Sequence, residues 1–271
     1  MRTRNTDRDW QVFGQVDPYW AVAVKEEYHR SRLTEQALRE FFASGASHVA
    51  AVFQIIRQYL DPKFQPASAL DFGCGVGRLL VPLAQVCGTV VGVDVSPGML
   101  QEARARCDAL GLSHVRLLPS DDNLSAVQEK FDLVHSYIVL QHIPCERGVH
   151  ILGRLLEVLH EGGVGALHFT YGHDGPPERS RYPRLKALVK AVGLYPVVRG
   201  LRQFGRSLRD RMRDGGQFQP YMQMNAYPLN DIFFRLQQAG IRRLHVEFSN
   251  HGGFVGLMLL FKKEAGDKYL L

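Results

Sequence analysis

Two acidic residues and a run of glycines follow short apolar stretches of this chain. The stretch "ALDFGCGVGRLL" passes through Asp71 and then Gly73, Gly75 and Gly77 before an apolar, helix-like run resumes. Glycines at a strand-to-helix turn let the backbone approach a ligand closely. A dinucleotide-binding loop would carry a third glycine where this chain has Arg78, and a pyrophosphate would be repelled by the carboxylate of Asp71. The loop therefore favours a ligand with cationic groups.

Further acids follow the next two apolar runs. The run "TVVGVD" ends in Asp94, which is placed to accept both ribose hydroxyls of a nucleoside cofactor. The segment "PSDDNL" supplies Asp121 and Asp122, either of which could accept a hydrogen bond from an adenine amino group. These acids fall at the carboxyl edge of a parallel sheet, where such folds bind ligands. S-adenosylmethionine fits this set, because it carries an ammonium and a sulfonium and no phosphate.

Strand-like and helix-like segments alternate from residue 68 onward. This alternation predicts crossover units and a parallel sheet. Only "SNHGG" separates the last two strand-like runs, which must therefore pair as an antiparallel hairpin. Before residue 68, an i, i+3, i+4 apolar pattern predicts a helix over 45–60, whereas the aromatic residues of 1–44 show no clear period. The expected strands are 69–72, 89–94, 114–118, 131–136, 163–171, 241–248 and 253–263, and the later helices 78–86, 96–110, 146–159 and 229–238.

The composition is that of a soluble globular protein. Of 271 residues, 45% are hydrophobic and 22% charged. The four cysteines are irregularly spaced, which indicates reduced thiols rather than disulfides, and no histidines accompany them at metal-site spacing. The start lacks the apolar core of a signal peptide, and the longest apolar run, "FVGLMLLF", is too short to span a bilayer. We therefore expect a cytoplasmic protein without a metal.

The positive charge is concentrated in one segment. The net charge is +6, but residues 173–218 hold eleven Lys and Arg against four Asp and Glu. An arginine stripe recurs there at three- and four-residue intervals beside an apolar set, which predicts a basic amphipathic helix that binds an anionic ligand or a membrane surface. A solvated lid face is the alternative interpretation. The stripe consists of Arg199, Arg202, Arg206, Arg209 and Arg213.

Five motifs in order resemble those of class I S-adenosylmethionine-dependent methyltransferases. They are "LDFGCGVGRLLVPLA", "VVGVDVSPGML", "PSDDNL", "FDLVHSYIVLQHIP" and "LLEVLHEGGVGAL". The resemblance covers about residues 68–169, and the strand pattern extends it to 263. It implies an α/β fold: a Rossmann-like seven-stranded sheet of order 3-2-1-4-5-7-6, with the last strand antiparallel and helices on both sides. The expected parts are an N-terminal helical cap (1–64), a core (65–172 and 219–265) and an inserted basic helical lid (173–218).

The resemblance also implies a cofactor-binding set. Gly73 and Gly75 would line the methionine part of S-adenosylmethionine, with Asp71 fixing the loop. Val95 and Met99 would pack on adenine, although ordinary core packing explains them equally well. The residues that follow the fourth strand would close the pocket. The complete set is Asp71, Gly73, Gly75, Asp94, Val95, Met99, Asp121, Asp122, Ser136, Tyr137 and Gln141.

The methyl acceptor leaves a weaker signature. Methyl transfer is an in-line displacement, and a hydroxyl acceptor needs a base to remove its proton. Three histidines are candidates: His142 in "LQHIP", His173 after the fifth strand and His251 in the terminal hairpin. His142 could equally be a pocket support.

The segment after the fourth strand bears on the acceptor class. It reads "SYIVLQ", without the N-P-P-[FY] tetrapeptide of amino-group methylases that act on bases. This favours O-methylation of a small-molecule, glycan or lipid-linked acceptor, with peripheral contact at the inner face of an anionic membrane as a further prediction. An RNA-directed methyltransferase is less favoured, because no recognised RNA module accompanies the basic stripe. A non-catalytic S-adenosylmethionine-binding protein is the other alternative.

Overall fold

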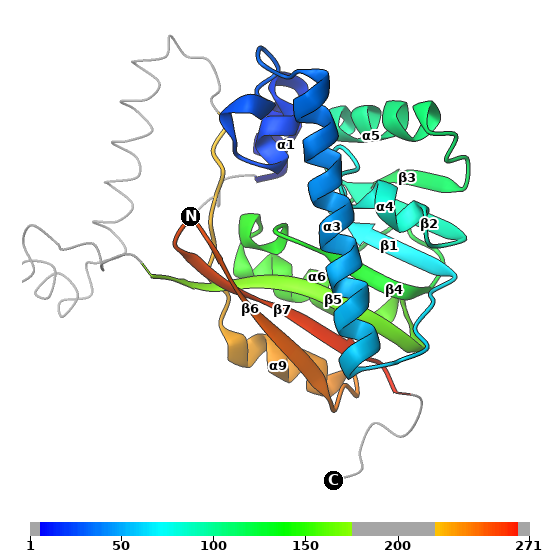
Figure 1. Cartoon of the computed structure of the whole chain (residues 1–271). Coiled ribbons are helices and arrows are strands. Elements are labelled where there is room, and N and C mark those ends of the chain that lie inside the picture. The colour runs from blue at the N-terminus through cyan, green and yellow to red at the C-terminus, as the bar shows by residue number, and fades with distance from the viewer. Residues whose placement is uncertain (1–5, 175–219, 265–271) are drawn as a thin grey trace, which may run out of the picture. The chain divides into compact units, whose positions relative to one another are not determined.

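A seven-stranded sheet organises the chain. The computed structural model describes residues 6–174 and 220–264. The strand order is β3-β2-β1-β4-β5-β7-β6 (Figure 1), and β7 runs antiparallel to both of its neighbours while the other pairs are parallel. The predicted order and the terminal hairpin are therefore confirmed. The strands are β1 (Ser68–Phe72), β2 (Thr89–Asp94), β3 (Val115–Pro119), β4 (Phe131–Ser136), β5 (Leu159–His173), β6 (Leu244–His251) and β7 (Phe254–Lys262).

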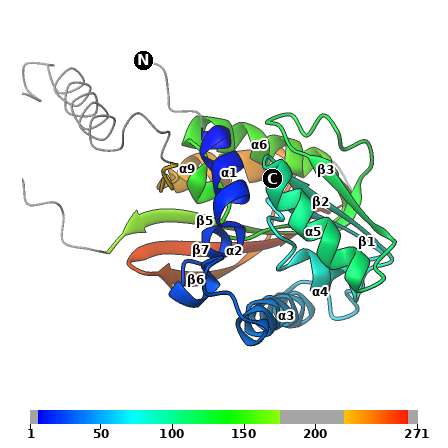
Figure 2. The ribbon, with the colours of Figure 1, turned by 90° about the horizontal axis from the view of Figure 1, so that it is seen from above.

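Helices cover both faces of the sheet. In Figure 2, α3 and α4 lie on one side and α6 and α9 on the other. The helical elements are α1 (Thr6–Val16), α2 (Pro18–Val22), η1 (Glu26–Tyr28), α3 (Glu35–Tyr59), α4 (Leu80–Ala84), α5 (Pro97–Ala109), η2 (Leu140–His142), α6 (Cys145–Glu157) and α9 (Leu229–Gln238). Among the described residues, none of these helices is both long and apolar enough to cross a bilayer.

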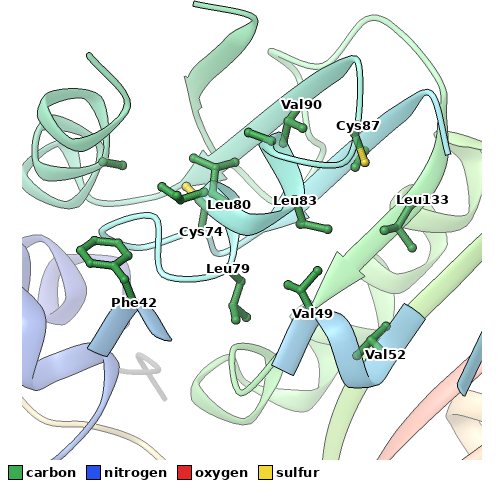
Figure 3. Packing of buried hydrophobic residues seen from close by; sticks show 14 of the residues in the cluster. Phe42, Val49, Val52, Cys74, Leu79, Leu80, Leu83, Cys87, Val90 and Leu133 are labelled. Atoms are coloured by element: carbon green, nitrogen blue, oxygen red, sulfur yellow. The ribbon is translucent and has the colours of Figure 1, made fainter. Parts of the chain in front are cut away.

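The central strands are apolar because both of their faces are buried. Successive side chains of a strand point to opposite faces. Val90 accordingly belongs to the core cluster beneath α3 and α4, and Val91 to the cluster beneath α6 and α9. Figure 3 shows Val49 and Val52 of α3 beside Leu83 in the first of these clusters. Phe13 of α1 and Ala21 of α2 belong to the same cluster, so these helices share the core of the sheet.

The N-terminal region is more helical than predicted. Helix α3 begins at Glu35, ten residues before the predicted start, and the Thr34 hydroxyl caps it by accepting from the Ala37 amide at 3.1 Å. Residues assigned no period form α1 and α2. Their aromatic side chains pack against several partners rather than along one stripe, so no 3.6-residue period is visible.

The boundaries of β5 and β6 also differ from the prediction, which gave 163–171 and 241–248. β5 begins at Leu159 rather than at 163, and a register shift against β4 accommodates the additional residues. Gly162, which lies between the predicted helix 146–159 and the predicted strand 163–171, is inside this strand with φ +80°. β6 continues to His251, so the turn of the hairpin consists of Gly252 and Gly253, both with positive φ. The predicted lid, residues 173–218, lies outside the described residues except for His173 and Asp174.

Candidate functional site

A pocket, partly open to solvent, lies at the carboxyl edge of β1 and β2. The loops that follow β1, β2, β3 and β4 form one wall, and residues of α1 and α2 form another. The structure therefore brings most of the predicted cofactor set together, although the strands that carry it are distant in sequence. The predicted residues that line the pocket are Asp71, Gly73, Gly75, Asp94, Val95, Met99, Asp121, Asp122, Tyr137 and His142.

The glycine loop takes a backbone path that side chains would block. Gly73, Gly75 and Gly77 have φ values of +74°, +53° and +87°, a region that residues with a Cβ adopt at a cost. A Cβ on Gly73 would lie 2.5 Å from the Val139 side chain, and one on Gly75 would lie 2.9 Å from Val22 of α2. The bare backbone therefore forms part of the pocket wall.

Asp94 is fixed in orientation by the loop that it faces. Its Oδ2 accepts from the Gly75 amide at 3.0 Å, and its Oδ1 accepts from the Ser96 amide at 2.9 Å. Burial raises the pKa of Asp94 to about 6, and the backbone hydrogen bonds oppose that shift only in part. Each carboxylate oxygen keeps acceptor capacity for a donor in the pocket. The geometry fits a pair of ribose hydroxyls.

Asp71 has one oxygen without a partner. The side chain is buried, and its Oδ1 accepts from Nδ1 of His135 at 2.9 Å. Its Oδ2 is buried with no hydrogen-bond partner among the described residues. Because an unpaired buried carboxylate oxygen is costly, this site calls for a donor supplied by a ligand. A ligand ammonium group fits this requirement, whereas a pyrophosphate does not.

The two acids predicted to meet adenine have structural contacts of their own. Oδ1 of Asp121 accepts from the amides of Asn123 and Ser125, and these bonds lower the pKa of Asp121. Both oxygens of Asp122 accept from the Arg147 guanidinium, at 2.7 and 2.8 Å. Hydrogen bonds with their own loop and with α6 therefore fix both carboxylates.

Arg147 is a pocket residue that the sequence did not reveal. Beyond Asp122, its guanidinium donates to both oxygens of Asp7 at 3.0 Å and to the Thr6 hydroxyl at 3.0 Å. It thereby connects α6, the loop after β3 and α1. Arg147 and Asp7 are 140 residues apart in the chain, so no local sequence pattern indicates that they interact.

Ser136 and Gln141 support the pocket from behind its surface. Ser136 is fully buried and donates to the Phe72 carbonyl at 3.0 Å. Gln141 is also buried, and its Oε1 accepts from the Thr170 hydroxyl at 2.6 Å. Neither belongs to the pocket-lining residues, whereas the neighbouring Tyr137 does. These two polar side chains fix the segment after β4.

His142 has partners on both ring nitrogens. Its Nδ1 lies 2.7 Å from the Gln223 carbonyl oxygen, which can only accept, so Nδ1 carries the hydrogen. Its Nε2 lies 3.3 Å from the Gln141 side-chain nitrogen, and Trp10 packs 5.0 Å from its ring. Burial lowers the pKa of His142 to about 4, so the ring is neutral near pH 7. These contacts favour the pocket-support interpretation.

The other two predicted histidines lie outside the pocket lining. His173, at the end of β5, is exposed and packs edge-on against Phe254 at 4.6 Å. His251, at the end of β6, has Nε2 3.4 Å from the Tyr137 hydroxyl, and burial lowers its pKa. Tyr137 thus connects the pocket with His251.

Three histidines that the sequence reasoning passed over lie around Tyr137. The ring of His48, from α3, lies 3.9 Å from the Tyr137 ring. The ring of His168, from β5, lies 5.2 Å from it. His135, from β4, is hydrogen-bonded to His48 and to Asp71. No spacing rule connects these positions, because an N-terminal helix and two strands bring them together.

Comparisons with known proteins agree with this architecture. Residues 69–163 match the family described as "Methyltransferase domain". Aklanonic acid methyltransferase DauC of Streptomyces sp. (strain C5) is 35% identical over 98 residues, 35% of this chain and 44% of that protein. A ubiquinone biosynthesis O-methyltransferase of Cereibacter sphaeroides (strain ATCC 17025 / ATH 2.4.3) is 35% identical over 80 residues, 30% and 32% of the two chains. The chain thus spans less than half the length of these curated relatives.

A solved structure extends the comparison to almost the whole chain. Magnesium protoporphyrin IX methyltransferase (ChlM) from Synechocystis PCC 6803 with bound SAM superposes with a TM-score of 0.58 at 16% identity. The superposition covers 97% of this chain and 99% of that one. At this identity the likeness shows the fold, and the sequence match shows the domain. Residues 69–163 thus match a methyltransferase domain in sequence, and the chain shares the fold of that methyltransferase.

Proposed function

We propose that this chain transfers the methyl group of S-adenosylmethionine to an oxygen atom of a small-molecule acceptor. The observation that carries the proposal is the pair of carboxylates at one pocket edge. Asp71 presents a buried oxygen that needs a cationic donor, and Asp94 presents a fixed carboxylate next to the glycine loop. A nucleoside with an ammonium group and without phosphate is the ligand chemistry that matches both.

Different residues would bind different parts of that cofactor. Asp71 would pair with the ammonium group, and Asp94 would accept from the ribose hydroxyls. Met99, which is almost fully buried, would give adenine an apolar floor. When bound, the cofactor supplies a methyl group activated by a sulfonium. The protein then needs to align the acceptor oxygen with that methyl group. Such alignment accounts for much of the rate enhancement, because it raises the effective concentration of the two reactants.

The relatives support a small acceptor. Two of them are named for aklanonic acid and for ubiquinone biosynthesis, which points to small organic acceptors, and the second is named as an O-methyltransferase. The aromatic rings of Trp10 and Tyr137 line the pocket and could pack on a ring-shaped acceptor. Glycan and lipid-linked hydroxyls belong to the same chemistry and form separate arms of the test.

Binding and transfer are tested separately. Calorimetry of the full chain with S-adenosylhomocysteine should give saturable binding, and NADH should give none. Methyl-labelled S-adenosylmethionine is then incubated with the protein and with separate fractions of small metabolites, lipids, glycans and RNA. Label in the small-metabolite fraction, in a bond that behaves as a methyl ether or ester, supports the proposal. Binding of NADH without the adenosyl thioether, or label in RNA alone, would overturn it.

A further inference from the structure

An acid and two histidines form a continuous hydrogen-bonded chain that begins at the pocket residue Asp71. Oδ1 of Asp71 lies 2.9 Å from Nδ1 of His135, and Nε2 of His135 lies 3.2 Å from Nε2 of His48. Asp71 and His135 are buried, and His48 is half-buried. The cofactor-binding role proposed above does not use either histidine.

The sheet register and one glycine bring the chain together. Asp71 of β1 and His135 of β4 are direct partners in the parallel register, so their side chains emerge on the same face. Helix α3 packs on that face. Gly45, one turn before His48, allows the close approach, because a Cβ at that position would lie 2.0 Å from the Arg78 carbonyl oxygen.

The hydrogens of the chain follow from the acceptor at its end. A carboxylate only accepts, so Nδ1 of His135 carries a hydrogen and its Nε2 keeps a lone pair. That lone pair accepts from the Nε2–H of His48. Nδ1 of His48 is then the free base of the chain. His48 is not itself among the pocket-lining residues, but Tyr137, which is, has its ring 3.9 Å from the His48 ring.

We propose that His48 is the general base for the acceptor hydroxyl and that His135 and Asp71 form its proton relay, which rests on the O-methyl transfer proposed above. The acceptor O–H bond breaks as its oxygen forms the bond to the methyl carbon, and the proton goes to Nδ1 of His48. The Nε2 proton of His48 passes to Nε2 of His135. The positive charge then rests on His135 beside the carboxylate of Asp71, and the released thioether is neutral.

The surroundings of His48 explain why a relay is needed. Burial first, and the neighbouring His135 and Arg78 after it, lower the pKa of His48 to about 2. An isolated imidazole here would be an unprotonated but weak base. Transfer to His135 moves the charge next to Asp71, where a carboxylate compensates it. His142 offers no comparable route, because its nitrogens face a carbonyl and an amide.

The relay also connects the acceptor side with the cofactor side. Asp71, which lines the pocket, uses Oδ1 for His135, and its Oδ2 is buried without a partner among the described residues. A ligand ammonium on Oδ2 would share the negative charge of the carboxylate. The hydrogen bond from His135 would then weaken, which gives the inference a readout that needs no acceptor.

The test uses ¹⁵N-histidine-labelled full-length protein and long-range ¹H–¹⁵N spectra. We expect the Nδ1–H tautomer for His135, the Nε2–H tautomer for His48, and one strongly deshielded imidazole N–H proton from the Asp71–His135 bond. Addition of S-adenosylhomocysteine should shift that proton upfield. Asp71→Asn should remove it, and His160→Gln, at an exposed position in β5, should leave it unchanged. The Nδ1–H tautomer at His48, or a deshielded proton insensitive to Asp71→Asn, would overturn the inference.

Turnover adds a second readout with whichever hydroxyl acceptor the label screen returns. His48→Gln should lower kcat about 100-fold with KM and S-adenosylhomocysteine affinity near wild type. His135→Gln should lower kcat by a smaller factor, because His48 keeps its contact with the acceptor. A stoichiometric divalent metal that is lost in His48→Gln would overturn the relay, since the two nitrogens would then be ligands. Failure of S-adenosylhomocysteine to bind would contradict the proposed function, whereas a wrong tautomer with intact binding contradicts only the relay.

Discussion

The carboxylate of Asp94 accepts a hydrogen bond from the Gly75 amide at 3.0 Å, which connects the end of β2 to the glycine loop that follows β1. The contact fixes the acid at the edge of the pocket and holds the loop in its positive-φ path. In the proposed function the same side chain would also accept from the ribose hydroxyls.

Removal of this side chain should weaken cofactor binding strongly. Asp94→Ala is expected to lose about 2–3 kcal/mol of S-adenosylhomocysteine binding, because two charge-assisted hydrogen bonds are lost. Calorimetry measures the loss, and Asp108→Asn, an exposed acid on α5, is the control. Unchanged affinity in Asp94→Ala would exclude Asp94 from the binding site.

The pH dependence of binding should report the same residue. Because burial raises the pKa of Asp94 to about 6, protons compete with a ligand that needs the carboxylate. S-adenosylhomocysteine affinity should be constant above that pKa and fall as the pH drops through it. Asp94→Asn should bind weakly with no step in this range. Affinity that rises on acidification would contradict the assignment.

A side chain at position 45 should disrupt the contact between α3 and the segment that follows the glycine loop. Gly45→Ala is expected to destabilise the fold by about 1–3 kcal/mol through overpacking, although alanine favours helix. Gly153→Ala in α6 is the matched control, because nothing lies within 4 Å of its added Cβ. That variant should gain up to about 1 kcal/mol. Urea unfolding compares the two, and equal effects would mean that α3 does not pack closely against the loop.

Arg147, which connects α1 with α6 and the loop after β3, should affect both the stability of the fold and ligand binding. Arg147→Ala leaves Asp7 and Asp122 without the guanidinium that both share in the structure. We expect a loss of about 2 kcal/mol in the free energy of unfolding and weaker S-adenosylhomocysteine binding, because α1 forms one pocket wall. Arg116→Ala, which breaks a more exposed pair with Glu129, should cost less than about 1 kcal/mol. Similar losses of stability in both variants would show that the contact of Arg147 with Asp7 and Asp122 contributes no more than an exposed ion pair.

His142 should behave as a support rather than as a base. His142→Ala removes its bonds to the Gln223 carbonyl and to Gln141 and leaves a void beside Trp10. Stability and S-adenosylhomocysteine affinity should fall together, by about 1–3 kcal/mol in unfolding. A fall in kcat alone, with binding and stability intact, would instead return the base to His142.

Short-range features of this protein could be predicted from its sequence. The glycine loop and the acids at the ends of β1 and β2 are each encoded within a few contiguous residues, because they follow from local backbone geometry. The antiparallel hairpin followed from a connection too short for a crossover. The order of the strands was implied by the family resemblance, and the structure confirms that order.

Contacts between distant segments were decided only by the tertiary structure. His48 meets His135 because α3 lies close to the loop at Gly45, and His135 meets Asp71 because β1 pairs with β4 in one register out of several. A slip of one residue would turn His135 to the other face of the sheet. Such contacts depend on how the surfaces of the helix and the sheet pack together, and a local sequence pattern does not predict this packing.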